Sequence, residues 1–158
     1  MKNTILIRRN GLLQQIHLRN YYMGETAKRK DNDADTIQSS KEDEELLMMF
    51  TRSACNELVT AVAVRFPSIT YTIDDDYISF TIETKSTVRE HLLPMLQQAI
   101  SDSLANAVNI MWLSIHRPES AGTGMALQQN IYNEVHRTLD KMENNRSIRR
   151  RTTDLGGI

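Results

Sequence analysis

The stretch SITYTIDDDYISFTIE, residues 68–83, interrupts a chain that is otherwise patterned as helix. Apolar and polar residues alternate on both sides of an aspartate run, with Ile69, Tyr71 and Ile73 before it and Ile78, Phe80 and Ile82 after it. Branched and aromatic residues in alternation favour strands, and aspartates favour turns. We therefore predict an antiparallel hairpin with one apolar face. A lone hairpin is marginal in water, so this face must pack on helices or pair with another chain.

Upstream of the hairpin, apolar residues recur every three or four positions, which is the spacing of one helix face. From about residue 46 to 65 they are Leu46, Leu47, Phe50, Ala54, Leu58, Ala61 and Val62. Ser39 and Glu42 match a capping box at the start of this helix, and Pro67 ends it. An earlier helix is predicted over 12–28, joined to the next by a polar linker, 29–40. Residues 4–7 fit either a short strand or a first helical turn.

Downstream, Thr87 and Glu90 can cap a helix that runs to about Arg117, with Pro94 either in its first turn or at a kink. Residues 120–124 contain two glycines and are expected to form a flexible loop. A final helix is predicted over 125–143, with apolar Leu127, Ile131, Val135, Leu139 and Met142. The predicted fold is mainly α, a helical bundle with an inserted antiparallel β-hairpin, about 68–83. It comprises a domain over 1–144 and an extended C-terminal arm over 145–158.

The whole-chain properties are those of a single globular domain. The chain has 158 residues, 40% hydrophobic and 25% charged, which is enough to form a core without disulfides or metals. The first residues contain too short an apolar run for a signal peptide, and no segment reaches the roughly 20 apolar residues of a membrane span. The single cysteine, Cys55, fits a small core residue. We therefore expect a protein made in a reducing cytosol, without membrane contact.

The C-terminal arm concentrates positive charge. Arg146, Arg149, Arg150 and Arg151 face one aspartate there, so the arm carries +3 and the rest of the chain −4, for a total of −1. Arginines bind carboxylates and phosphates through several donors at once, and Leu155 and Ile158 can add apolar anchors. The arm is either a solvated terminus or a segment that orders on the acidic surface of a neighbouring copy, on a partner ring or on DNA.

Metal and catalytic sites find little support in the sequence. Carboxylates at Asp31, Asp33, Asp35 and Glu42 occupy positions 1, 3, 5 and 12 of a calcium loop, but Thr36 stands where that loop needs glycine. We interpret the run as a solvated linker, and Asp74–Asp76 as a turn. No histidine pairs with another metal ligand at a helical spacing: the four are His17, His91, His116 and His136. No phosphate loop or nucleophile motif is present, so we expect no cofactor and no catalysis.

The order of these elements, together with the stretches 19–25 (RNYYMGE), 75–80 (DDYISF) and 111–113 (MWL), resembles small virion proteins of tailed bacteriophages. The similarity is greatest to head–tail connector, or adaptor, proteins of phages of gut Bacteroidetes. It implies a ring, commonly twelvefold, between the portal protein and the tail or neck proteins, with possible non-specific contact to packaged DNA. It also implies synthesis in the host bacterial cytoplasm and a final place in the virion at the head–tail junction.

By position, the resemblance places the hairpin and the arm at interfaces. The residues expected there are Ile69, Tyr71, Tyr77, Phe80, Arg146, Arg149, Arg150, Arg151, Leu155 and Ile158. The predicted function is therefore that of a ring-forming virion structural protein. The alternatives are another neck or tail-completion protein, a nucleic-acid-binding accessory protein that uses the arginine arm, and an enzyme or metal-dependent switch built on the acidic linker.

Overall fold

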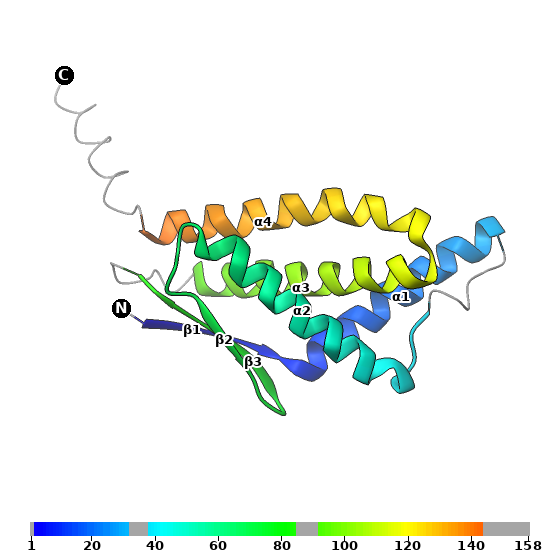
Figure 1. The fold of residues 1–158 in the computed structure, drawn as a ribbon, viewed down its shortest axis with the longest axis horizontal. Helices are drawn as coiled ribbons and strands as arrows, with labels where there is room; N and C mark the ends of the chain where they lie inside the picture. Colours follow the sequence, from blue (N-terminus) through cyan, green and yellow to red (C-terminus); the bar gives the residue numbers. More distant parts are fainter. Residues whose placement is uncertain (1, 32–37, 85–91, 144–158) are drawn as a thin grey trace, which may run out of the picture.

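The computed structural model describes residues 2–31, 38–84 and 92–143 (Figure 1). The long helices are α1 (Arg9–Asp31), α2 (Glu44–Ala63), α3 (Leu92–His116) and α4 (Ala121–Glu143). The strands are β1 (Lys2–Arg8), β2 (Thr70–Ile73) and β3 (Tyr77–Glu83), and the 3-10 turns are η2 (Lys41–Asp43) and η3 (Pro118–Ser120). The fold is mainly α, with a small antiparallel sheet, as predicted. The C-terminal arm, the caps Thr87 and Glu90, and His91 lie outside the described residues.

The predicted hairpin is present, and β1 extends it to three strands. The strand order is β1-β3-β2, with β3 in the middle and both pairings antiparallel. Ile5 lies opposite Phe80, and Ile7 lies opposite Ile78, so the apolar residues of both strands share one face. Residues 4–7 are therefore a strand, which resolves the alternative that periodicity left open.

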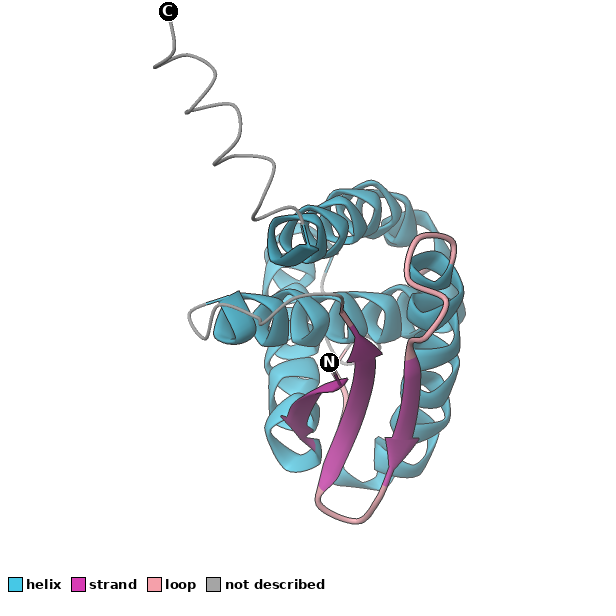
Figure 2. Cartoon of the chain, turned by 90° about the vertical axis from the view of Figure 1, so that its left-hand side faces the viewer, coloured by secondary structure: helices cyan, strands magenta, loops and turns pink. Residues whose placement is uncertain are grey.

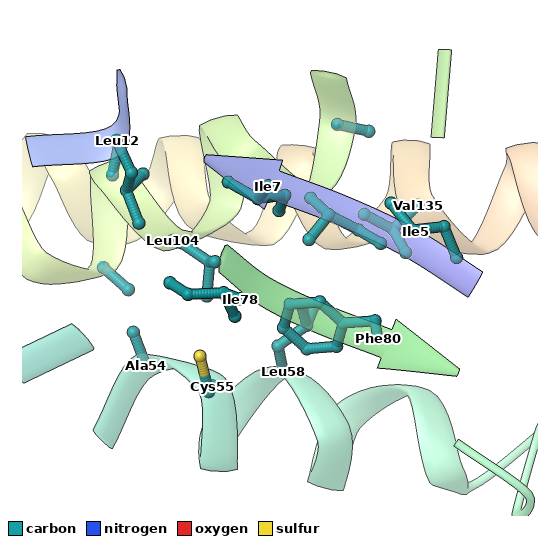
Figure 3. Packing of buried hydrophobic residues seen from close by; sticks show 14 of the residues in the cluster. Ile5, Ile7, Leu12, Ala54, Cys55, Leu58, Ile78, Phe80, Leu104 and Val135 are labelled. Carbon is teal, nitrogen blue, oxygen red and sulfur yellow. The ribbon is translucent and has the colours of Figure 1, made fainter. Parts of the chain in front are cut away.

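The apolar face of the sheet packs on the chain's own helices. Figure 3 shows Ile78 and Phe80 of β3 facing Cys55 and Leu58 of α2, and all four side chains are fully buried. The outer face carries smaller polar residues such as Ser79 and Thr81, which are half-buried. The hairpin thus gains its stability from helices within the same chain, because burial removes apolar surface from water.

Helix α3 is the centre of the bundle. It contacts α1, α2, α4 and β1, and every residue from Ser103 to Asn109 is buried. Pro94 lies in its first turn, where a missing amide donor has no effect on the helix. Figure 2 shows the surrounding helices on both flanks of the sheet and above it.

Buried amides join α3 to its neighbours, and the apolar periodicity gave no indication of them. Asn109 donates to Asn20 of α1 at 2.7 Å, and Asn106 donates to Gln128 of α4 at 2.8 Å. Gln128 in turn donates to the Ser103 hydroxyl at 3.2 Å. A buried polar group without a partner is strongly destabilising, so these pairs favour one arrangement of the helices.

The predicted loop at 120–124 is wrong. Its first residue, Ser120, ends η3, and its other four residues belong to α4, which begins at Ala121. Gly124 lies at a close approach of α4 to α3, because a Cβ built there would be 2.8 Å from Ile110 Cγ1. Asn106 also donates to the Gly124 carbonyl at 3.0 Å. This glycine therefore allows α4 to pack closely on α3. The sequence had suggested a loop because glycine is typical of loops.

The helix cap is one residue later than predicted. The Ser40 amide donates to Asp43 Oδ2 at 2.7 Å, whereas the sequence had suggested Ser39 and Glu42. Ser39 instead bonds to α1, with its Oγ 2.7 Å from His17 Nδ1 and 2.9 Å from Asn20 Nδ2. The linker is also shorter than expected, since α1 continues to Asp31.

Candidate interaction surfaces

The hairpin residues predicted at an interface divide into two kinds. Ile69 and Phe80 are 4% and 0% exposed, so in this fold they lie in the core and have no surface to offer a partner. Tyr71 and Tyr77 are half-buried, and the Tyr71 hydroxyl donates to Asn56 Oδ1 of α2 at 2.6 Å. Ile69 and Phe80 are buried because the apolar face of the sheet packs on α2 and α3. Only the two tyrosines remain available to a partner, and the arm residues lie outside the described part.

The aspartate turn is stabilised locally, as the sequence suggested. Asp74 Oδ1 accepts hydrogen bonds from the amides of Asp76 at 2.8 Å and Tyr77 at 2.7 Å. Bonds from Tyr77 and Asp76 favour the ionised carboxylate and hold the pKa of Asp74 below its ordinary value of 3.8. The carboxylate therefore acts as a turn element.

We expect Asp74→Ala to destabilise the protein at neutral pH and to lose that effect in acid. Because the folded pKa of Asp74 is depressed, its contribution is present above the unfolded pKa and disappears as pH falls through the folded value. Urea unfolding of both proteins at pH 7 and below pH 3.8 would measure the difference. Asp75→Ala removes one charge from the same turn without removing either amide bond. A wild-type advantage that persists unchanged in acid would contradict this role.

Among the residues that the structure describes, no group of three or more His, Cys, Asp or Glu side chains could hold a metal ion. Asp33 and Asp35 lie outside those residues, and Glu42 lies in η2. The described histidines, His17, His116 and His136, are half-buried. His17 Nε2 lies 3.5 Å from Glu44 Oε1, and His116 stacks on Trp112 at 4.0 Å between ring centroids.

Cys55 is a core residue, as predicted. Its side chain is fully buried beneath the sheet, and burial raises the pKa of the thiol to about 12. Arg52 opposes this shift only in part. A thiol that remains protonated is a poor nucleophile, so Cys55 contributes packing and no reactive group.

Helix α1 presents an apolar stripe to solvent. Leu18, Tyr21 and Tyr22 are 53%, 49% and 62% exposed, and positions three and four apart lie on one face of a helix. The two tyrosine rings contact each other edge to face, with centroids 5.8 Å apart. We call these three residues the α1 stripe. Large apolar side chains gathered on one exposed face are typical of interaction sites.

A groove of about 540 Å³ lies between α2 and α4. It is lined by Ala61, Val64, Arg65, Gln129, Asn133, His136, Arg137 and Asp140. Val64 is 85% exposed, and an ion pair between Arg65 and Asp140, 2.7 Å long, joins the turn after α2 to α4. His136 Nδ1 is buried and has no hydrogen-bond partner among the described residues. We call this hollow the α2–α4 groove.

Comparison with known proteins adds no assignment to these surfaces. No family model, curated protein or solved structure matches the chain. In the described part of the chain, no helix has both the length and the apolar character needed to cross a bilayer.

Sequence reasoning missed both surfaces. The sequence feature that indicates the α1 stripe is the adjacent pair Tyr21 and Tyr22. In a helix, both cannot lie on the buried face that contains Ile16. The groove had no signal in the sequence, because it depends on how α2 and α4 meet across α3. A second cavity, about 630 Å³, borders Glu45, Met49 and Asp75 near the hairpin turn.

Proposed function

We propose that this chain is a structural subunit that assembles into the head–tail connector ring of a tailed bacteriophage, between the portal protein and the tail. The observation that carries the proposal is the exposed α1 stripe, where Leu18, Tyr21 and Tyr22 leave apolar surface in water. Such surface is favourable once another protein covers it. The order of elements, with long helices around a hairpin and a basic arm at the end, supports the same class.

The proposed role needs a stable body and separate contact surfaces. The body is supplied by α3, whose buried middle is enclosed by three helices and the sheet. Contacts are supplied by exposed helix faces and, in this proposal, by the arm, whose four arginines complement an otherwise acidic chain. A ring subunit uses such surfaces for its neighbours, the portal and the next layer of the neck.

The mass of the purified full-length protein in solution tests this proposal. We expect sedimentation velocity and native mass spectrometry to give a multiple of 18.2 kDa, and negative-stain images to show closed rings. Addition of the portal protein encoded alongside the chain should produce a joint complex. A protein that remains monomeric at all concentrations, alone and with that portal, would refute the assignment.

The arginine content of the arm favours nucleic-acid binding as the second candidate function. Under that reading, DNA affinity should fall steeply with salt, because binding of phosphates releases counterions. Deleting residues 146–158 separates the two. A connector should lose its incorporation into particles while the subunit still folds, whereas a DNA-binding accessory should lose salt-dependent affinity for duplex DNA and keep its monomeric mass.

A further inference from the structure

The cavity near the hairpin turn brings together two acidic runs that are far apart in the sequence. Residues 42–45, at the start of α2, are all acidic, and the aspartates 74–76 form the turn between β2 and β3. Both runs line the cavity of about 630 Å³, through Glu44, Glu45 and Asp75. We call it the hairpin-turn cavity. Its acidic character depends on the fold, because neither run alone encloses it.

The two runs account for the negative charge of the body. They contain seven carboxylates, whereas the cavity lining and the adjacent residue supply three cations, Arg9, Arg52 and Lys41, which leaves −4. The whole chain before the arm also carries −4. Within the described residues, the side chains of Glu45 and Asp75 form no hydrogen bond or ion pair. Carboxylates grouped in this way repel one another, so a cationic partner is favourable there.

The hairpin-turn cavity also offers apolar surface. Leu13, Met48 and Met49 line it, and Met49 is 63% exposed. Methionine adapts its shape to a partner. Arginine combines a long apolar stem with a head that binds carboxylates through several donors. A lining that is both acidic and apolar therefore fits an arginine-rich segment.

The chain's own C-terminal arm has this chemistry. Residues 145–158, which lie outside the described part, contain four arginines and carry +3. These arginines follow Glu143, the last residue of α4, by at most eight positions, so they extend no more than about 28 Å beyond the helix. Figures 1 and 2 show α4 and the hairpin turn on opposite sides of the body, with α3 between them. The arm therefore begins on the side away from its own cavity.

We infer that the arm of one copy binds the hairpin-turn cavity of a neighbouring copy. The arginines pair with Glu45 and Asp75, and their stems pack on Met49. Because the arm and the cavity lie on opposite sides of the subunit, the contact is head to tail. The charges that carry this inference belong to the chain itself, so it holds for any assembly of this protein and adds a contact to the proposed ring.

Reversing two charges of the cavity tests the contact. Glu45→Lys combined with Asp75→Lys changes two exposed side chains, so circular dichroism and thermal melting should match the wild type. In sedimentation velocity at about 0.1 M salt, this cavity variant should associate at least about tenfold more weakly than the wild type. Association of the wild type should itself weaken towards about 1 M salt, because screening shortens the reach of exposed charges from about 10 to about 3 Å.

Two further variants keep this comparison interpretable. Glu57→Lys is the matched control, since Glu57 is exposed on the same helix, α2, but outside the cavity. It should associate as the wild type does. If the lysine pair alters the melting curve, Glu45→Gln with Asp75→Asn removes the same two negative charges with little change in size, and it should weaken association in the same direction.

A charge swap gives the deciding result. Arg149→Glu with Arg150→Glu in the full-length chain should weaken association as the cavity variant does, and combining both pairs of reversals in one chain should restore it. Failure of the combined variant to recover would overturn the inference. A cavity variant that assembles as well as the wild type would also overturn it, while leaving the proposed ring in place.

Hydrogen exchange of the arm separates a neighbour's cavity from the subunit's own. The arm amides should be protected in the associated wild type and should lose that protection on dilution to monomer and in the cavity variant. Protection that persists in the monomer would overturn the contact between copies. A wild type that stays monomeric with an unprotected arm would overturn it too, whereas a complex of that wild type with the portal protein would keep the connector assignment.

Discussion

Replacing Phe80 with alanine is expected to lower the free energy of unfolding by about 3–5 kcal/mol, a large part of the stability of an ordinary domain. Phe80 is fully buried in the central strand, and its ring lies 5.9 Å from that of Tyr71. It also occupies the space between the sheet and α2 (Figure 3). Truncation removes apolar contacts and leaves a cavity that two helices and two flanking strands cannot close. Urea denaturation followed by circular dichroism would measure the loss.

Ser79→Ala is the control for this substitution. Ser79 precedes Phe80 in the same strand but lies on the opposite, half-buried face, so its removal should change stability by no more than about 0.5 kcal/mol. The contrast depends on the register of β3, because a shift of one residue would exchange the two faces. Equal losses for the two variants would show that the register is different.

Gly124→Ala is expected to destabilise the protein by about 1–3 kcal/mol, although alanine normally favours a helix over glycine. The added methyl group would lie 2.8 Å from Ile110 Cγ1, which is too close for any pair of carbons. Isoleucine is branched at Cβ and has few alternative rotamers in a helix, so α4 must move away from α3. Movement would also strain the bond from Asn106 to the Gly124 carbonyl. Thermal unfolding should show a decrease in Tm of several degrees.

Gly122→Ala separates this effect from helix propensity. Gly122 belongs to the same first turns of α4, but an added Cβ there meets no atom within 4 Å. We expect this variant to be neutral or more stable by up to about 1 kcal/mol. Opposite signs at two glycines two residues apart would locate the close approach of α3 and α4. A stabilising Gly124→Ala would place that approach elsewhere.

The parts of the fold that could be predicted are those in which local pattern and tertiary packing agree. The hairpin followed from alternation around Asp74–Asp76, and the middle of α2 followed from a helical stripe that packs as one face. Strand β1 could not be assigned, because its short apolar run fits a strand or a helix and only its pairing with β3 decides. The start of α4 was missed because Gly122 and Gly124 suggest a loop locally, while contact with α3 favours a helix.

The candidate surfaces could be predicted from the sequence less well than the fold. The resemblance placed Phe80 at an interface by position, whereas the structure buries it against the chain's own helices. Leu18 and Val64 fall outside the apolar periods predicted for their helices, and their exposure depends on which helix face meets the rest of the bundle. The buried amides Asn20, Asn106 and Asn109 could not be predicted for the same reason. Polar residues on a helix are normally assigned to solvent, and only tertiary structure reveals a partner.

The pairing of β1 with β3 also sets an order on folding during synthesis. Residues 2–8 leave the ribosome before residues 77–83, which are their hydrogen-bonding partners. Until that later segment emerges, the apolar side chains of Ile5 and Ile7 have no strand beside them, and closing the intervening loop carries an entropic penalty that grows slowly with its length. The nascent chain therefore holds β1 unpaired until residues 77–83 have been synthesised. Chaperone binding to β1 should end when β3 is released from the exit tunnel.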